Sequence, residues 1–424
     1  MAMAVHNGPM GAGLMSHEPL MLSCRFPEDE AMEEGAGPMR RFTRGFIWTA
    51  AAAGASLLIA SLLPGCAVGY VARQSATHLR VLAARQPVDR AIADGKVPPH
   101  WLHGIETIRA ARTFAVQHLN LPAADLYETI SLVRPGPTWV VTACPRDALQ
   151  PVTWWFPVAG RVAYRGYYDR EDAEQFAAGL RRKDLDVMVR PAGAFSTLGW
   201  FADPIRPSML QGRESSLVDL VLHEAAHRLV YIKGQTDFNE ALATFIGRRG
   251  TLLFYGQRED ATCPTCRYLE DRAADAATFA TFLDEIIQEL TTLYDSPLAR
   301  EEKLTARREI FAAARHSARL LPARGAGYEW FAAGDLDNAV ILSLRRYGGD
   351  QDLFADLLSS CGGDLRRALN ALQERFRWEG LSRAARRTTS PAGYLRGLLG
   401  QDSGCLGEEP ATLTAQSPSP PPDN

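Results

Sequence analysis

Two histidines and a glutamate stand close together at residues 223–227, which read HEAAH. On a helix, His223 and His227 lie one turn apart and project from the same face, so both imidazoles can reach one metal ion. Glu224 then lies beside that metal and can take a proton from a bound water. A random chain with this histidine content would contain the pattern in roughly one case in a hundred. The spacing therefore indicates a zinc site of the hydrolytic kind.

A hydrolytic zinc site also needs a third protein ligand and an open position for water. Glu240 is the leading candidate, because it lies early in the helix expected after a tight turn at Gly234, and two helices joined in this way are antiparallel neighbours. Residues 237–240 also match a D-x-x-E capping box, in which Glu240 would only cap that helix. Asp237 is the reserve ligand. We favour Glu240 as a ligand, since two histidines on a buried helix need a nearby partner.

The helix that carries the motif is expected to run from Ser216 to Lys233. Apolar residues lie on nearly all of its sides, which indicates burial. Ser216 and Asp219 match an S-x-x-D capping box, although Asp219 also lies one turn before His223 and could orient its ring. A donor to the oxyanion is needed as well, and none of its candidates stands out: Tyr164, Tyr167, Tyr231, His316 and Tyr328.

A small sheet is expected just upstream of the motif, within about residues 136–202. Its strand candidates are the β-branched and aromatic run 139–144, the alternating stretch 154–168 and the run 186–190. Residues 195–199 are a further candidate. This strand is expected either to hold an extended peptide by strand addition or to wall the core, and both interpretations stay open.

Helices are expected on both sides of the sheet and through about residues 213–390. Their apolar residues recur near a period of 3.6, and the expected segments are 77–85, 103–120, 170–183, 238–248, 274–292, 304–321, 338–347, 351–360 and 365–373. The stretch from Glu259 to Asp271 is expected to be a loop. The sequence thus predicts an α+β domain over residues 66–390 and a disordered tail over residues 391–424.

The N-terminal region is typical of an export signal. Basic residues at 40, 41 and 44 precede an apolar run over 46–63, and the following Pro64-Gly65-Cys66 completes a stretch that resembles a bacterial lipobox. We expect residues 39–65 to be a lipoprotein signal peptide and Cys66 to be lipidated. The alternative is an uncleaved transmembrane anchor. Residues 1–38 are acidic where a basic flank belongs, so they are interpreted as a non-native or disordered extension before a start at Met39.

The expected cellular location of the protein follows from this export signal. Both interpretations place most of the protein outside the cytoplasm. The residue after the cysteine is Ala67 rather than Asp, as in lipoproteins of the outer membrane that face the periplasm.

The hydrophobic content of 46% and charged content of 22% are those of a globular protein. The net charge of −3 gives no reason to expect nucleic acid as a partner. In an oxidising compartment, Cys263 and Cys266 are expected to form a local disulfide.

The blocks around the motif resemble a known family. HEAAH followed by GQTDFNEALATF, with TWWFPVAGRVAYRGYYD and AFSTLGWFADP upstream, is similar to a bacterial family of predicted zinc aminopeptidases of the gluzincin type, over about residues 68–385. The resemblance implies a zincin-like metallopeptidase fold and Zn²⁺ as cofactor. It also implies His223, His227 and Glu240 as zinc ligands and Glu224 as general base. The G-x-M-E-N motif, by which well-studied gluzincin aminopeptidases hold the substrate's free amine, is absent.

The expected function is zinc-dependent hydrolysis of peptide bonds at the cell envelope, aminopeptidase-like in type. The substrate is then a peptide, and the membrane is reached through a lipid anchor on Cys66. The alternative is an envelope binding or scaffold protein that keeps the metal site for structure, which a fourth protein ligand would indicate. Neither the oligomeric state nor the choice between exopeptidase and endopeptidase action follows from the sequence.

Overall fold

The computed structural model describes residues 67–133, 137–156, 160–192, 203–325, 327–400 and 405–406. The chain divides into two compact units, residues 1–73 and 74–424, and the first is described only from Ala67, where α2 (Ala67–Ala83) begins. No helix in these ranges is long and apolar enough to cross a bilayer. The expected extension 1–38, the signal peptide 39–65, Cys66 and the edge strand 195–199 lie outside the described residues.

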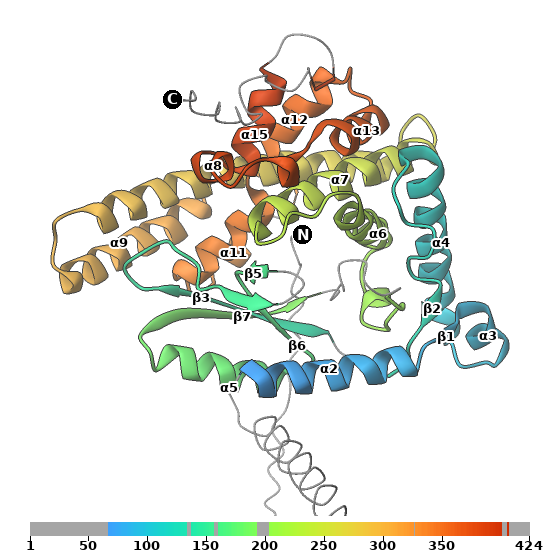
Figure 1. Cartoon of the computed structure of the whole chain (residues 1–424), viewed down its shortest axis with the longest axis horizontal. Helices are drawn as coiled ribbons and strands as arrows, with labels where there is room; N and C mark the ends of the chain where they lie inside the picture. Colours follow the sequence, from blue (N-terminus) through green and yellow to red (C-terminus); the bar gives the residue numbers. More distant parts are fainter. Residues whose placement is uncertain are drawn as a thin grey trace, which may run out of the picture. The chain divides into compact units, whose positions relative to one another are not determined.

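A three-stranded antiparallel sheet forms the β-containing part of the second unit (Figure 1). β3 (Thr138–Pro145) lies in the centre, between β6 (Arg165–Tyr167) and β7 (Leu185–Ala192). The register pairs Val140 with Gly166 on one side and with Arg190 on the other. Two smaller pairs are β1 (Gln86–Pro87) with β2 (Thr129–Ile130) and β4 (Trp154–Phe156) with β5 (Gly160–Val162). The three expected strand regions are confirmed, although 154–168 holds three short strands.

Helices make up most of the remaining described chain, so the arrangement is α+β, as expected. In chain order they are α3 (Val88–Ala93), α4 (Pro99–Leu119), α5 (Arg170–Arg181), η1 (Met209–Gln211), α6 (Glu214–Leu229), α7 (Thr236–Gly256), α8 (Pro264–Asp295), α9 (Arg300–Ala318), α10 (Glu329–Ala332), α11 (Asn338–Gly348), α12 (Gln351–Ser360), α13 (Leu365–Arg375), η2 (Trp378–Gly380), α14 (Ala385–Thr388) and α15 (Pro391–Leu399).

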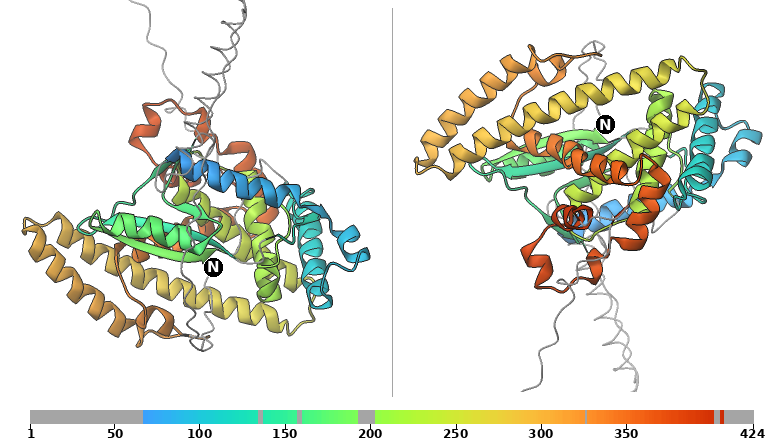
Figure 2. Two further views of the ribbon diagram at one scale, coloured as in Figure 1. Left: turned by 90° about the horizontal axis from the view of Figure 1, so that it is seen from below. Right: turned by 90° about the horizontal axis from the view of Figure 1, so that it is seen from above.

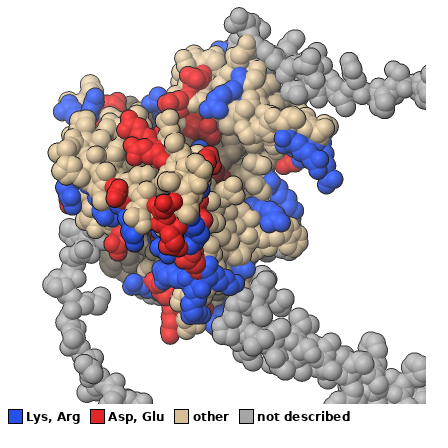
Figure 3. All heavy atoms as spheres, turned by 90° about the vertical axis from the view of Figure 1, so that its left-hand side faces the viewer, with Lys and Arg blue, Asp and Glu red and all other residues tan. Residues whose placement is uncertain are grey.

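The long helices α8 and α9 lie side by side (Figure 2). Aromatic and aliphatic side chains of these two helices and of α10 and α11 form a second hydrophobic cluster, separate from the main core around α4, α6 and α7. Because α6 carries the HEAAH motif, the motif lies in this main core. Basic and acidic side chains intermix on the face of the molecule shown in Figure 3.

Two expectations about element boundaries near the motif are wrong. α6 begins at Glu214, with Arg213 as its N-cap, and ends at Leu229, so Ser216 lies inside the helix and does not cap it. α8 begins at Pro264, within the stretch expected to be a loop, so that Glu270 and Asp271 are helical. Proline at the first helical position suits a helix start, because its missing N–H has no partner there in any case.

The expected start of the disordered tail at residue 391 is also wrong. Pro391 begins α15, and the hydroxyl of Ser390 accepts a hydrogen bond from the backbone N–H of Gly393 at 3.0 Å. Leu395 and Leu398 on this helix are buried in the main core. A disulfide between Cys361 and Cys405 joins the chain after α15 to the end of α12. The helix α15 was not predicted, because its residues were assigned together with the Pro- and Ser-rich end of the sequence.

α7 packs against α6 and approaches it closely at two glycines of α7. A Cβ atom on Gly247 would lie 3.0 Å from the backbone oxygen of Asp219 and would collide with its carboxylate, while one on Gly250 would lie 2.6 Å from Cδ1 of Leu222. Both neighbours belong to α6. The distance between the two helices therefore depends on the absence of side chains at these positions of α7.

Replacing Gly247 with alanine should destabilise the protein, although alanine favours helix by about 1 kcal/mol over glycine. The overpacked Cβ is expected to cost about 1–3 kcal/mol, because a backbone atom cannot move aside as a side chain can. Gly179→Ala in α5 is the matched control, since its Cβ would meet only the end of the Arg182 side chain at 3.7 Å. Urea denaturation should show a loss for the first variant and no loss for the second. Equal stability of Gly247→Ala and wild type would contradict this close packing.

Candidate metal centre

The turn between α6 and α7 is held by one buried side chain, Asn239. Its Oδ1 accepts a hydrogen bond from the backbone N–H of Ile232 at 2.9 Å, and its Nδ2 donates to the carbonyl of Ile232 at 2.8 Å. Gly234 lies between them with φ of +79°, which suits glycine. Because the two bonds tie the turn to the first turn of α7, they set where the next residue, Glu240, faces α6.

Three side chains from α6 and α7 meet at this point. Nε2 of His223 lies 3.4 Å from Oε2 of Glu240, and Nε2 of His227 lies 3.9 Å from Oε1 of the same carboxylate. The candidate ligand atoms of all three residues lie within 4.8 Å of one another. A tetrahedral metal with bonds of about 2.0–2.1 Å holds its ligand atoms about 3.3 Å apart. The group therefore fits one metal ion after a small adjustment of side chains.

Burial and mutual charge set the protonation of the group. Burial raises the pKa of Glu240, but the hydrogen bond with His223 and the charges of His227, His223 and Arg346 outweigh it and lower that pKa to about 2. Burial lowers the pKa of His227 to about 4. Burial also lowers the pKa of His223, but its hydrogen bond with Glu240 and the nearby carboxylates leave it raised above 6.5. Near neutral pH, Glu240 is thus ionised and His227 neutral, as metal ligands must be.

The other acidic residues of the expected site lie around this group. Glu224 is buried on α6, and its charge raises the pKa of His223, as does the charge of Asp219. Asp237 does not join the group: its Oδ1 accepts from Nε of Arg346 at 3.0 Å. The N-cap of α7 is Gln235, with no side-chain capping bond. The capping interpretation of residues 237–240 is therefore wrong, and so is the choice of Asp237 as reserve ligand.

Two of the five candidate oxyanion donors lie beside the group. The phenol of Tyr164 donates to Oε1 of Glu240 at 3.5 Å, and the ring of Tyr231 lies 6.4 Å from that of His227. Tyr167 packs against Phe176 instead, and Tyr328 donates to the backbone of Asp275. His316 lies in α9, whose apolar side chains belong to the second cluster.

Three residues near the group were missed by the sequence analysis: Tyr127, Arg346 and Tyr347. The charge of Glu224 adds to the effect of burial in raising the pKa of Tyr127, and the charge of Glu240 does the same for Tyr347. No local pattern marks these tyrosines. Arg346 did leave a signal, because it stands one turn after the buried Leu342 of α11, on the apolar face where an arginine is unusual.

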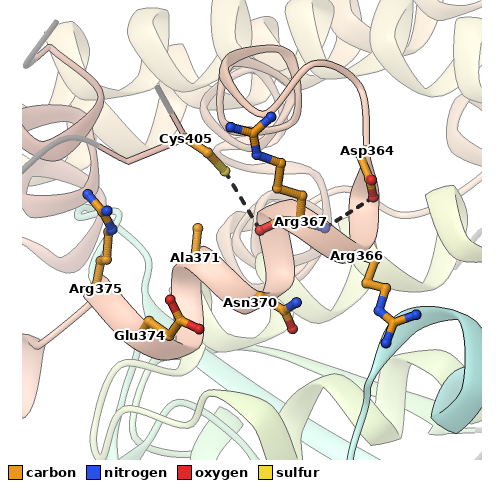
Figure 4. Close-up of a pocket in the computed structure, with 8 residues that line it drawn as sticks. All are labelled: Asp364, Arg366, Arg367, Asn370, Ala371, Glu374, Arg375 and Cys405. Atoms are coloured by element: carbon orange, nitrogen blue, oxygen red, sulfur yellow. Dashed lines mark hydrogen bonds between the residues drawn. The ribbon is translucent and has the colours of Figure 1, made fainter. Parts of the chain in front are cut away.

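A groove of about 520 Å³ lies elsewhere, on α13 (Figure 4). Its lining residues are Asp364, Arg366, Arg367, Asn370, Ala371, Glu374, Arg375 and Cys405. Asp364 accepts from the backbone N–H of Arg367 and so caps the helix. None of the residues of the metal group lines this groove, which is a feature of the C-terminal helices.

Residues 69–389 match the model of a family described as "Putative aminopeptidase", which covers more than half of the chain. The chain belongs to this family. No curated protein and no solved structure matches it. The matched range agrees with the extent expected from the sequence, and it includes both α6 and α7. The family's name points to peptide hydrolysis, and therefore to a peptide as substrate.

Replacing Asn239 with leucine should remove the support of the α6–α7 turn. The N–H of Ile232 would then be buried without a partner, at about 1–3 kcal/mol, whereas its C=O would keep the hydrogen bond from the backbone N–H of Gln235. The free energy of unfolding should fall by about 1–3 kcal/mol, and metal binding should weaken because Glu240 is no longer held. Asn370→Ala, which removes a surface hydrogen bond with Asn120, is the control and should change stability by less than about 0.5 kcal/mol. Similar stability of the two variants would contradict this role of Asn239.

Metal affinity should rise with pH until the proton of His223 is lost. A metal binds only the neutral imidazole, and the raised pKa of His223 lets protons compete above the range of an ordinary histidine. Glu240 and His227 are already in their binding forms near neutral pH, so the proton released on metal binding should come from His223, and this release should disappear as the pH rises past the pKa of His223. Titration calorimetry in buffers of different ionisation enthalpy measures this release. A metal affinity that does not change with pH near neutrality would contradict the raised pKa of His223.

Proposed function

We propose that the protein is a zinc-dependent peptidase of zincin-like type, whose metal is held by His223, His227 and Glu240. The observation that carries this proposal is the meeting of two imidazoles and one carboxylate, from two helices, within 4.8 Å. That donor set suits zinc and is typical of hydrolytic sites that keep a fourth position for water. In the described part of the chain, the group holds no fourth His, Cys, Asp or Glu, which favours a catalytic site over a structural one.

The reaction assigns separate tasks to the residues of the site. Zinc, when bound, would act as a Lewis acid on the scissile carbonyl and lower the pKa of a water. Glu224, next to His223 on α6, is the general base that takes a proton from the attacking water and passes it to the leaving amine. The phenol of Tyr231, whose ring lies 6.4 Å from that of His227, would donate to the oxyanion, because the single proton of the Tyr164 phenol is donated to Glu240. His223 is the more exposed of the two histidines, at 17% against 4% for His227, so a peptide approaches from its side.

The proposed location is the cell envelope, with a lipid anchor on Cys66 and the catalytic part facing the periplasm from the outer membrane. The basic residues, apolar run and lipobox-like ending of residues 39–66 support it. Further support comes from the disulfides Cys263–Cys266 and Cys361–Cys405, because disulfides persist in oxidising compartments. The substrates are then peptides present at the envelope.

Glu224→Gln should retain zinc and lose roughly 10²–10⁴-fold in peptide hydrolysis, because the amide cannot accept the proton of the water. Zinc content is measured by elemental analysis, and hydrolysis by mass spectrometry of a peptide library. Glu214→Gln on the same helix is the matched control: Glu214 is exposed, pairs with His103 at the surface, and should be dispensable. Hydrolysis by Glu224→Gln at the wild-type rate would exclude the proposed general base.

A further inference from the structure

Arg346 of α11 is deeply buried, although it carries a charge. Its side chain is 1% exposed, and burial of a guanidinium is costly unless partners satisfy it. Its charged partner, Asp237, is 63% exposed, and its Nη1 has no hydrogen-bond partner among the described residues. Arg307 shows the contrast, because two of its nitrogens donate to Asp186, which is itself only 7% exposed. An ion pair of this kind does not explain why Arg346 is buried.

The position of Arg346 relative to the metal group is specific. Its guanidinium carbon lies 5.5 Å from the centre of the Tyr164 ring, and its Nη2 donates to the carbonyl of Ala163 at 3.5 Å. Both residues lie in the short connection between β5 and β6. The phenol of Tyr164 in turn donates to Oε1 of Glu240. A continuous path of contacts thus leads from Arg346 through Tyr164 to a candidate metal ligand.

The same arginine also holds the start of α7. Its Nε donates to Asp237, which lies in the first turn of that helix, just ahead of Glu240. Arg346 therefore joins three separate parts of the chain: α11, the start of α7 and the β5–β6 connection. A planar guanidinium can donate in two directions while its face packs on a ring, whereas the ammonium group of lysine cannot.

We propose that Arg346 is a positioning residue of the metal centre, which holds the Tyr164 phenol against one oxygen of Glu240 so that the other oxygen faces the metal. This inference rests on the proposed function, because it takes Glu240 as a zinc ligand. Partners that orient a metal ligand typically contribute 10–100-fold to metal affinity. Arg346 itself is not one of the three candidate ligands. Its effect reaches the metal through Tyr164.

A double-mutant cycle tests this coupling. Zinc dissociation constants of the full chain are measured by competition with a chromogenic chelator for wild type, Tyr164→Phe, Arg346→Lys and the double variant. Each single substitution should weaken zinc binding about 10-fold or more. The double variant should bind zinc no more weakly than whichever single variant has the higher zinc dissociation constant, because both changes break the same path of contacts. Arg307→Lys is the matched control, which should lower the unfolding temperature and leave the zinc dissociation constant unchanged.

Asp237→Asn provides a second test that does not alter a buried residue, in case Arg346→Lys fails to fold. It loosens the hold on Nε of Arg346, so zinc binding should weaken in the wild-type background and not in the Tyr164→Phe background. Unchanged zinc affinity in both Arg346→Lys and Asp237→Asn would overturn the proposal, as would losses that simply multiply with that of Tyr164→Phe. Absence of zinc binding by the wild-type protein would instead contradict the proposed function.

Discussion

The pairing of α6 with α7 is the constraint on which the candidate site depends, because its three candidate ligands come from both helices. His223 and His227 are brought together by the helical repeat alone. Glu240 reaches them only through the turn and the packing, and a slip of one residue in α7 would rotate it by about 100°. Two independent contacts prevent such a slip. Asn239 fixes the start of α7 on Ile232, and Gly247 and Gly250 fix its later turns against α6.

The C-terminal helices give further support to the start of α7. Phe238, two residues before Glu240, packs against Phe354 of α12 and stacks on Phe376 after α13. The amide of Gln351 donates to the carbonyl of Ala241 at 3.1 Å. The Cys361–Cys405 disulfide closes this region onto the chain that follows α15. The helices after residue 350 thus brace the turn of α7 that carries the third candidate ligand.

Several ionisable side chains are buried at the candidate site, and the attraction between their opposite charges offsets the free-energy cost of removing them from water. The hydrogen bond between His223 and Glu240 opposes the effect of burial on both pKa values. A buried cluster of this kind is expensive unless its members are paired or hold a metal. Apolar residues of α4 and α7 surround α6, so the few polar groups in this core are concentrated where the metal ion would be. Perturbed groups concentrated in this way are typical of functional sites.

Local patterns predicted the site better than they predicted the boundaries of the fold. The positions of His223 and His227 follow from spacing, and Glu240 followed from a short connection between two helices. The end of α6 at Leu229 could not be read, because apolar residues continue past it into the buried turn. α15 was not predicted, because the Pro-rich composition of the residues after it made the whole segment look disordered. The place of Arg346 on the apolar face of α11 marked it as unusual, but its contacts and the Cys361–Cys405 pair join residues far apart in the sequence, which no local pattern encodes.

The central claim is that α6 and α7 together hold one zinc ion and leave one coordination position open. Its most direct test is a crystal of the full chain grown with zinc, with anomalous data collected on both sides of the zinc absorption edge. We predict a single strong peak about 2 Å from Nε2 of His223, Nε2 of His227 and a carboxylate oxygen of Glu240, with a non-protein atom in the fourth position. No peak between these three side chains, or a fourth protein ligand that closes the site, would contradict the account.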